Sequence, residues 1–512
     1  MSPASRHCGV LLHPTSLPGP HGSGDLGPAA FHFVDWLTTA GQDLWQMLPL
    51  VPVGPGNSPY ASASAFAGSP LLIALEPLTE RGWLDRRTLA EAAGLRADRV
   101  DFARVIPWRM GRLRETCAGF ALRASAADRA DLAAFCNAHA HWLDDHALFM
   151  ALDAHYAARG IACWTQWADG HARRHDAALA NARVALASEI EFQRFVQWCF
   201  QRQWEALRQH AAARGVRLIG DLPIFVAHHS ADCWAHQPLF RLDAAGEPTV
   251  VAGVPPDYFS ATGQRWGNPL YDWQAMQRDG FAWWVARLRH ELARADLVRI
   301  DHFRGFAACW EIPATCPTAI DGRWVEAPGA ALFEAARNTL GPLALIAEDL
   351  GVITPDVEAL REACGFPGMK VLQFAFGGAA SHPFLPHNHP RHCVAYTGTH
   401  DNDTAAGWAA SAAPHERAHA AAYLGLDAAA ATDHALADAL LRAALASVAR
   451  WALYPMQDVL GLGSAHRMNT PGQMDCWTWR FRWEDVGPEP AARLAQRAAL
   501  YGRGPAAESA RG

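Results

Sequence analysis

Acidic side chains follow four apolar runs of this 512-residue chain, each at or near the point where the run ends. A charge placed directly after a buried strand is costly unless it is paired or lines a cavity. Any one of these acids could simply cap the next helix, but four placed alike predict a polar cavity where several strands end. The acids are Asp221, Asp301, Glu348 with Asp349, and Asp401 with Asp403.

The acids that follow two of these runs are suited to different catalytic roles. Residues two apart in a strand share a face, so Arg299 and Asp301 should point the same way and His302 the other. A guanidinium beside Asp301 favours the ionised carboxylate that a nucleophile requires. Glu348 and Asp349 must face opposite sides, and the longer Glu348 is the better proton donor to a leaving oxygen. One ionised carboxylate and one carboxylic acid across a bond is the arrangement that glycoside chemistry needs.

Aromatic residues could supply the binding surface. The chain holds 21 Trp residues, most of which we expect in the core or on packed helices. Tyr60, Tyr258 and Trp266 instead lie in Gly/Pro-rich segments, where the flat face of a sugar ring could stack on them.

The elements that must position these residues alternate along the chain. Continuous apolar runs typical of buried parallel strands cover residues 9–13, 44–51, 216–226, 297–303, 343–350, 370–376 and 393–399, with a weaker one near Val459. Helical patterns, several with a Pro start or a Gly stop, cover residues 28–40, 189–214, 281–295, 330–340 and 355–364. This alternation favours an α/β barrel or a doubly wound sheet. In a barrel all the strand-end acids would meet at one mouth.

Two stretches interrupt the alternation. Residues 77–188 have a helical pattern, which predicts a mainly helical insertion. Residues 230–280 are rich in Gly, Pro, Trp and Tyr, which predicts an ordered, loop-rich insertion that covers the substrate. The remaining segments, 1–76, 189–229 and 281–505, are assigned to the catalytic barrel, and 506–512 to a frayed tail.

Composition and motifs exclude several classes of protein. The net charge is −7 and no basic run stands out, so neither nucleic acid nor an anionic membrane is an expected partner. The chain has no secretory signal and no apolar stretch of transmembrane length, and its 11 Cys never form a C-x-x-C pair. We therefore expect a cytoplasmic protein with reduced thiols. Gly22-x-Gly24-x-x-Gly27 matches a dinucleotide fingerprint, but three prolines separate it from the preceding strand, where that motif needs a tight turn.

Nine ordered motifs give the chain a family resemblance. They include Asn57-Ser-Pro-Tyr, Arg299-Ile-Asp-His-Phe-Arg-Gly and Thr399-His-Asp-Asn, and they occupy residues 9–18, 57–62, 220–224, 251–260, 263–269, 299–305, 347–351, 399–402 and 467–472. With them the chain resembles, along nearly its whole length, the amylomaltases. These are 4-α-glucanotransferases, or disproportionating enzymes, of glycoside hydrolase family 77 in the α-amylase superfamily.

The resemblance implies a fold and a set of roles. The expected fold is a (β/α)₈ TIM barrel with helical and loop-rich insertions and no C-terminal β-sandwich. Asp301 would be the nucleophile that forms a covalent glucosyl-enzyme, and Glu348 the general acid and base. Asp401 would hold sugar hydroxyls and stabilise the transition state. The implied substrate-binding positions are Ser58, Tyr60, Asp221, Asp257, Gln264, Trp266, Arg299, His400 and Asn469.

The same resemblance implies the ligands. Maltooligosaccharides and other α-1,4-glucans would serve as donor and acceptor, no metal or organic cofactor would take part, and the chain would be a monomer or a weak homodimer. Four residues depart from the family pattern: Pro55, where an aromatic is frequent, His229, where an acid is common, and His466 and Cys476.

Three other functions remain open at this level. An α-glucan hydrolase would use the same residues with water as the acceptor. A Schiff-base aldolase would need a lysine at the carboxyl end of a strand, whereas Lys370 is expected at a strand's start. A glucan-binding protein without catalysis is disfavoured because the acids are intact.

Overall fold

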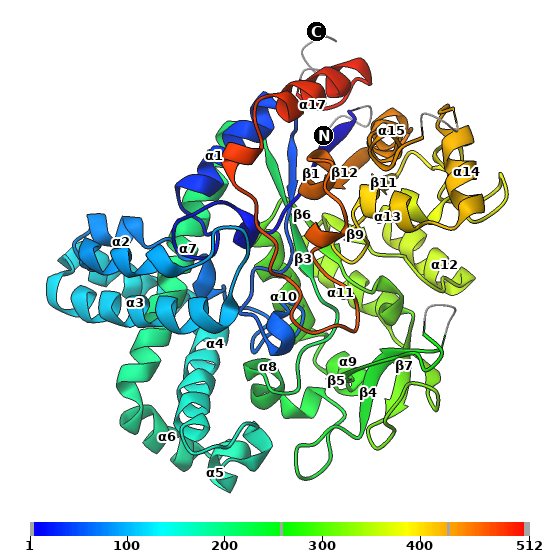
Figure 1. Ribbon diagram of the computed structural model, residues 1–512. Helices are drawn as coiled ribbons and strands as arrows, with labels where there is room; N and C mark the ends of the chain where they lie inside the picture. The colour runs from blue at the N-terminus through cyan, green and yellow to red at the C-terminus, as the bar shows by residue number, and fades with distance from the viewer. Residues whose placement is uncertain (1–4, 257–259, 428–430, 506–512) are drawn as a thin grey trace.

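A closed barrel of parallel strands forms the centre of the molecule (Figure 1). The computed structural model describes residues 5–256, 260–427 and 431–505. Eight strands follow the order β10-β11-β12-β1-β2-β3-β6-β9, and the Ala347 N–H donates to the Pro367 carbonyl at 2.9 Å, which joins the β9 end of the sheet to the residue before β10. The strands are β1 (His7–Leu11), β2 (Leu44–Gln46), β3 (Arg217–Leu222), β6 (Leu297–Ile300), β9 (Leu345–Ala347), β10 (Gly368–Val371), β11 (Cys393–Tyr396) and β12 (Trp451–Pro455). The predicted (β/α)₈ fold is confirmed.

Helices cover the outside of this barrel. All five predicted helices are present within two residues of their expected bounds, because proline starts and glycine stops mark several of their ends. Gly365, for example, ends its helix in the left-handed conformation with φ 69°. These helices are α1 (Pro28–Thr39), α7 (Ala187–Ala213), α10 (Ala282–Arg294), α11 (Gly329–Leu340) and α12 (Pro355–Cys364). The helices α13 (Ala405–Ser411), α14 (Pro414–Tyr423), α15 (Asp433–Ala446) and α17 (Glu489–Leu500) complete the C-terminal part.

Two strand predictions are wrong in position. The last barrel strand is β12, and Val459 instead ends the one-turn helix α16 (Met456–Val459). The Trp451–Pro455 run is fully buried between β1 and β11. Its apolar pattern directly follows an Ala-rich helical segment, from which it could not be told apart in the sequence. Lys370 is the third residue of the four-residue β10 rather than the first of a longer strand, and its ammonium lies 5.0 Å from the Phe384 ring centroid. Strands β2 and β9 are also shorter than the apolar runs that contain them.

Residues 77–188 contain helices and no extended strand. In Figure 1 these helices lie on one side of the barrel. The longest carries a capping box at its start, in which the Ser125 side chain and the Asp128 backbone and side chain bond reciprocally. The helices are α2 (Glu76–Glu80), α3 (Phe102–Arg123), α4 (Ala126–Ala157), α5 (Asp169–Ala172) and α6 (Asp176–Ala185).

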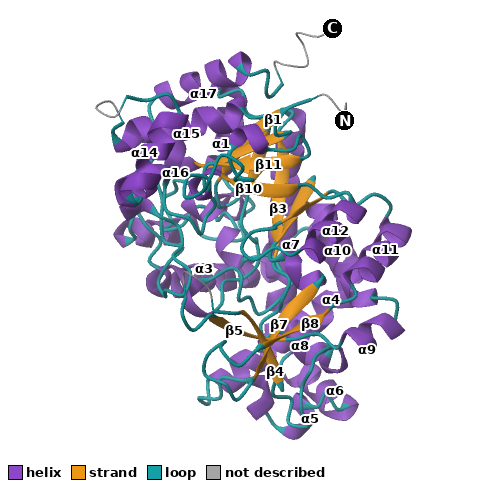
Figure 2. Cartoon of the chain, turned by 90° about the vertical axis from the view of Figure 1, so that its right-hand side faces the viewer, coloured by secondary structure: helices purple, strands orange, loops and turns teal. Residues whose placement is uncertain are grey.

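The second insertion holds an antiparallel sheet that the sequence did not reveal. Strands β4 (Val250–Val254) and β5 (Gln264–Pro269) pair with each other, and β4 also pairs with β7 (Ala308–Pro313), which pairs with β8 (Arg323–Glu326). Figure 2 shows this sheet apart from the barrel strands. Strands β7 and β8 come from the stretch assigned to the barrel, so that assignment is wrong for them. The pairing of β4 with β7 joins residues as far apart as Val250 and Pro313, so no local periodicity in the sequence marks it. The short helices α8 (Ala231–Ala235) and α9 (Trp273–Arg278) flank β4 and β5.

No helix among the described residues is both long and apolar enough to cross a membrane.

Close packing of β1 on β2 gives a stability prediction. Gly9 is paired with Leu44, and a Cβ added to it would lie 2.1 Å from the Leu44 carbonyl oxygen. Gly9→Ala should therefore destabilise the fold by about 1–3 kcal/mol, because the two strands must move apart. Gly111→Ala is the matched control: it lies within α3 with open space around it, and should stabilise by up to about 1 kcal/mol through helix propensity. Thermal unfolding of both variants measures the two effects, and equal midpoints would contradict this account.

Candidate active site

An arginine between two carboxylates organises the mouth of the barrel. Asp221 on β3 is the register partner of Arg299 on β6, so their side chains leave the same face of adjacent strands. The Arg299 guanidinium donates to both Asp221 oxygens at 2.8 Å and to Asp301 Oδ1 at 2.7 Å. Arg299 and Asp301 thus share a face, as predicted. The Asp221 and Arg299 side chains are buried, whereas the Asp301 side chain is 29% exposed and can meet a ligand.

Tyr60 completes this group from the loop after β2. Its hydroxyl donates to Asp221 Oδ2 at 2.7 Å. Burial and the Asp221 charge raise the pKa of Tyr60 well above its usual value, so the hydroxyl keeps its proton. Burial raises the pKa of Asp221, while the Arg299 charge and the Tyr60 hydroxyl lower it. Through its hydrogen bonds to both groups, Asp221 holds the Tyr60 and Arg299 side chains in place.

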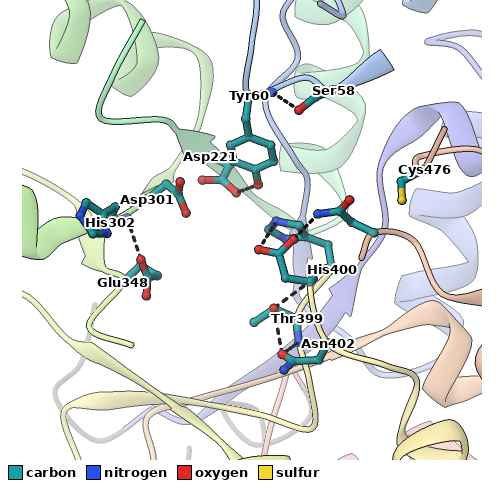
Figure 3. A network of polar contacts seen from close by, with 12 residues as sticks. Ser58, Tyr60, Asp221, Asp301, His302, Glu348, Thr399, His400, Asn402 and Cys476 are labelled. Carbon is teal, nitrogen blue, oxygen red and sulfur yellow. Dashed lines mark hydrogen bonds and ion pairs between the residues drawn. The ribbon is translucent and has the colours of Figure 1, made fainter. Parts of the chain in front are cut away.

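Glu348 lies beside Asp301 at the end of β9, and both face the same space (Figure 3). Two backbone N–H groups donate to its carboxyl group, from His302 at 2.7 Å and from Leu350 at 2.8 Å. Burial raises the pKa of Glu348 to about 8, against the lowering effect of Arg299 and with a further rise from the Asp301 charge. The group is therefore protonated at neutral pH and can act as an acid.

Asp349 points away from the mouth, as the strand alternation predicts. Its carboxylate accepts from the Met369 N–H at 2.6 Å and lies 3.3 Å from the Arg361 guanidinium. This acid belongs to the packing of β10 and α12 and takes no part in the site.

Asp401 stands on the opposite side of the mouth, after β11. Asn469 donates to Asp401 Oδ1 at 2.5 Å, and His400 Nε2 lies 3.4 Å from Oδ2. The Asp401 side chain is 43% exposed. The His400 ring stacks on Tyr60 with centroids 5.2 Å apart, which links this group to Asp221. Figure 3 shows His400 across the mouth from Asp301 and Glu348.

The remaining predicted contacts surround this mouth. Trp266 on β5 is 39% exposed, unusual for so large an apolar side chain, and its indole N–H donates to Gln264 at 3.2 Å. Ser58 Oγ accepts from the Tyr60 N–H at 3.2 Å. Asp257 and Tyr258 lie outside the described residues.

Two residues of the site were missed at the sequence level. His302 follows the end of β6 and has φ 53°, so strand alternation no longer applies to it. Its N–H reaches Glu348, and its ring packs edge-on to Trp266 with centroids 4.8 Å apart. Trp477, with φ 66°, packs 5.7 Å from Tyr60 and 5.9 Å from His400. His302 belongs to the Arg299-Ile-Asp-His-Phe-Arg-Gly motif, whereas none of the nine motifs includes Trp477.

The four departures take ordinary structural places. Pro55 is exposed, and His466 accepts from the Trp479 indole at 3.2 Å. Cys476 Sγ lies 3.4 Å from the Thr470 N–H, while His229 binds Asp153 at 2.8 Å. None of them contacts a carboxylate of the mouth in the described structure.

One cluster with metal-ligand chemistry lies elsewhere in the described part of the chain. It consists of His21, Asp25 and Glu76, whose ligand atoms lie within 4.8 Å of one another. The Arg109 guanidinium already binds Asp25 at 2.9 Å, and a cation beside it would be repelled. The absence of a metal from the reaction stays a prediction.

Fold and site together define a (β/α)₈-barrel enzyme whose polar site lies at the carboxyl ends of the strands. A family model described as 4-alpha-glucanotransferase matches residues 12–485. The chain is 52% identical over 495 residues to a 4-alpha-glucanotransferase of Thermus thermophilus, covering 96% of this chain and 97% of that one. It is 45% identical over 502 residues to that of Synechocystis, covering 97% and 98%. Among solved structures, amylomaltase from Streptococcus agalactiae in complex with acarbose has a TM-score of 0.93 and 37% identity, covering 98% of this chain and all of that one.

The chain belongs to the 4-α-glucanotransferase family. The family resemblance inferred from the motifs is thereby confirmed, and transfer of α-1,4-glucan segments is favoured over the hydrolase, aldolase and binding-protein alternatives.

The raised pKa of Glu348 gives a pH prediction. A group with a raised pKa keeps its proton below that value, here about 8, and loses it as the pH rises through it. The pH dependence of kcat/KM reports the pKa values of the free enzyme. With a maltodextrin donor, kcat/KM should therefore fall about tenfold per pH unit above pH 8, because the protonated fraction of Glu348 falls by that factor. With an α-glucosyl fluoride, whose leaving group needs little protonation, this alkaline limb should be absent. A limb that begins near pH 5, or that persists with the fluoride, would contradict the assignment of the acid.

Proposed function

We propose that the enzyme transfers α-1,4-glucan segments by a retaining double displacement in which Asp301 is the nucleophile and Glu348 the acid and base. The observation that carries this proposal is the difference between the two carboxyl groups. Asp301 bonds to a guanidinium at 2.7 Å, whereas Glu348 keeps a proton because burial raises its pKa to about 8. Two carboxyl groups held in opposite charge states at one site are what a glycosidic bond cleavage requires.

In the first step Asp301 attacks the anomeric carbon of the donor. Oδ1 is held by Arg299, so we assign the attack to Oδ2. The bond from the anomeric carbon to the leaving oxygen breaks, and that oxygen takes the Glu348 proton. The products are a glucosyl ester on Asp301, a released glucan and an ionised Glu348.

In the second step the acceptor hydroxyl takes the place of the leaving group. The Glu348 carboxylate removes its proton, the hydroxyl oxygen bonds to the anomeric carbon, and the Asp301 ester bond breaks. The same residue is thus acid in one direction and base in the other. Two inversions at one carbon leave the α configuration unchanged.

The other side chains orient the sugar and the carboxylates. Asp401 is held by Asn469 and His400 and is exposed to the mouth, a position suited to accepting bonds from sugar hydroxyls and to stabilising positive charge on the ring. Trp266 offers an exposed aromatic face near His302, on which an acceptor sugar can stack. Ser58, Gln264 and Asp257 are proposed as further substrate contacts.

The proposed substrates are maltooligosaccharides and longer α-1,4-glucans, as donor and acceptor alike. The S. agalactiae amylomaltase structure, a complex with acarbose, supports a sugar-like ligand for this fold. A cytoplasmic location and a monomeric or weakly dimeric state are proposed with them.

Incubation with maltotriose tests transfer against hydrolysis. Transfer of glucosyl or maltosyl units to a second maltotriose should yield glucose together with a ladder of longer maltodextrins. Chromatography that resolves each chain length over time measures both product classes. Glucose and maltose without longer products would mean that water is the acceptor and that the enzyme is a hydrolase.

The same assay tests whether glucan transfer requires a metal ion. The ladder should be unchanged after dialysis against a chelator, because the proposed steps use only protein carboxylates. Loss of transfer that calcium or zinc restores would contradict this part of the proposal.

Substitution of the two carboxyl groups tests their roles. Asp301→Asn keeps the side-chain shape but removes the nucleophilic charge, so turnover should fall by at least about 10⁴-fold while glucan binding persists. Glu348→Gln should be similarly inactive on maltodextrins but should form the glucosyl-enzyme from α-glucosyl fluoride, seen as a mass increase of one glucosyl unit on the protein.

Two control variants and one geometric measurement complete this test. Asp427→Asn and Glu326→Gln change exposed carboxylates that are not among the residues assigned to the site, and they should leave turnover unchanged. In a crystal structure the Asp301 and Glu348 carboxyl groups should lie about 5–5.5 Å apart, the spacing of a retaining enzyme. A separation above roughly 8 Å, or a β-anomer as first product from the fluoride, would indicate inversion.

A further inference from the structure

The loop that follows β9 is held at both of its ends by two consecutive residues of the turn after β6. This loop, residues 348–352, begins with Glu348 and is called the acid loop below. The Phe303 N–H donates to the Glu348 carbonyl at 3.1 Å. The guanidinium of the next residue, Arg304, donates to the Val352 carbonyl. The backbone of the acid loop is therefore tied to the segment that follows Asp301.

The acid loop in turn sets the position of the Glu348 carboxyl group. The Leu350 N–H, inside the loop, donates to Glu348 Oε1 at 2.8 Å. The direction of a backbone N–H is fixed by the peptide plane that carries it. A shift of the acid loop would therefore move this donor away from the carboxyl group that it holds.

Arg304 has few partners for a buried cation. Its side chain is 5% exposed, and no carboxylate in the described part of the chain forms an ion pair with it. Burial lowers the pKa of Arg304, and the Asp356 and Cys309 charges oppose this effect only in part. A buried guanidinium is costly unless other groups compensate its charge. Besides the Val352 carbonyl, the group that does so is the ring of Trp324.

Trp324 on β8 covers the guanidinium with its aromatic face. The guanidinium carbon lies 3.7 Å from the centroid of the Trp324 ring, which is the contact of a stacked cation–π pair. Trp310 on β7 is the register partner of Trp324, and their rings meet edge to face with centroids 5.2 Å apart. The Trp310 indole N–H donates to the Ala319 carbonyl at 2.9 Å. The ring that covers Arg304 is thus itself held by the second sheet.

We propose that Trp324 is a positioning residue for the acid: by stacking on Arg304 it holds the acid loop and so keeps Glu348 in place. It acts through Arg304 and the Val352 carbonyl and not as a catalytic residue. The catalytic consequence rests on the proposed role of Glu348, whereas the hold on the loop can be measured without glucan transfer. The second sheet would then serve the site from both of its edges, through Trp266 on β5 and Trp324 on β8.

Hydrogen–deuterium exchange, read by peptide mass, measures the hold on the acid loop directly. In Trp324→Ala the guanidinium loses its ring, so amides of residues 348–354 should exchange at least ~10-fold faster than in the native enzyme. Trp324→Phe keeps an aromatic face and should restore most of the protection. Arg304→Met removes the charge and the bond to Val352. It should open the same loop while the amides of β8 stay protected.

Ile320→Ala is the matched control. Ile320 lies in the segment before β8 and is 52% exposed, and it takes no part in the stack on Arg304. This variant removes exposed apolar surface from the same region, so it should leave both the exchange of the acid loop and the activity unchanged. An Ile320→Ala variant that behaves like Trp324→Ala would overturn the proposal.

Two donors separate positioning of the acid from a general structural role. With maltodextrin the leaving oxygen must be protonated, so kcat/KM of Trp324→Ala should fall by about tenfold. With α-glucosyl fluoride, which needs little protonation, formation of the glucosyl-enzyme should stay within about twofold of the native rate. Because the Leu350 N–H stabilises the ionised Glu348, its loss should also move the alkaline limb upward by about 0.5–1 pH unit.

Three results would contradict the proposal. Unchanged exchange of the acid loop in both Trp324→Ala and Arg304→Met would overturn it, whichever residue is the acid. Faster exchange with equal losses on both donors would give the stack a structural role only. A higher KM for long maltodextrins with an unchanged loop would make Trp324 a glucan contact instead. Failure of the proposed function differs from all three, because Glu348→Gln would then stay active on maltodextrins while the loop still opened in Trp324→Ala.

Discussion

The Arg299 guanidinium is the charge on which the barrel mouth depends. It lies buried between Asp221 and Asp301 and binds both within 2.8 Å. A buried ion pair of this kind is a poor source of stability, but removing one partner leaves an uncompensated charge at a cost of about 3–5 kcal/mol. The pairing therefore acts as a constraint: β3 and β6 must keep their register for the three charges to meet. Asp301 is presented to the mouth because its neighbour two residues back is fixed.

The same constraint separates the properties of the two acids. Arg299 lowers the pKa of Glu348 and the Asp301 charge raises it, but burial is the larger effect and leaves the acid protonated. The backbone contributes as well, since His302 in a left-handed conformation turns its N–H toward Glu348 at 2.7 Å. A non-glycine residue in this conformation is strained, and such strain persists where the surrounding structure fixes it. Here the contacts of His302 with Glu348 and Trp266 do so.

The insertions supply side chains at the rim of the site that the barrel itself does not carry. Strand β5 brings Trp266 to His302 at the rim, and β5 is held through β4 by β7, a strand that follows β6 in the chain. The second sheet is thus built from two segments, one that follows β3, which bears Asp221, and one that follows β6, which bears Arg299. On its outer side the loop after β3 meets the helical insertion through Trp164, whose indole donates to the His228 carbonyl at 2.8 Å.

The sequence by itself determined the barrel, its principal helices and the identity of the strand-end acids. Buried parallel strands are apolar throughout and helices carry their own stop signals, so β6 and α12 could be recognised locally; Glu348 and Asp349 could be told apart by alternation alone. Only the tertiary structure decided which residues meet across long separations. The antiparallel pairing of β4 with β7 and the packing of Trp477 against Tyr60 join segments that lie tens to hundreds of residues apart. The physical reason is that apolar runs and helix-end residues are local features of the sequence. Charge pairing and the pKa of Glu348 instead depend on distances between residues that are set only when the chain folds.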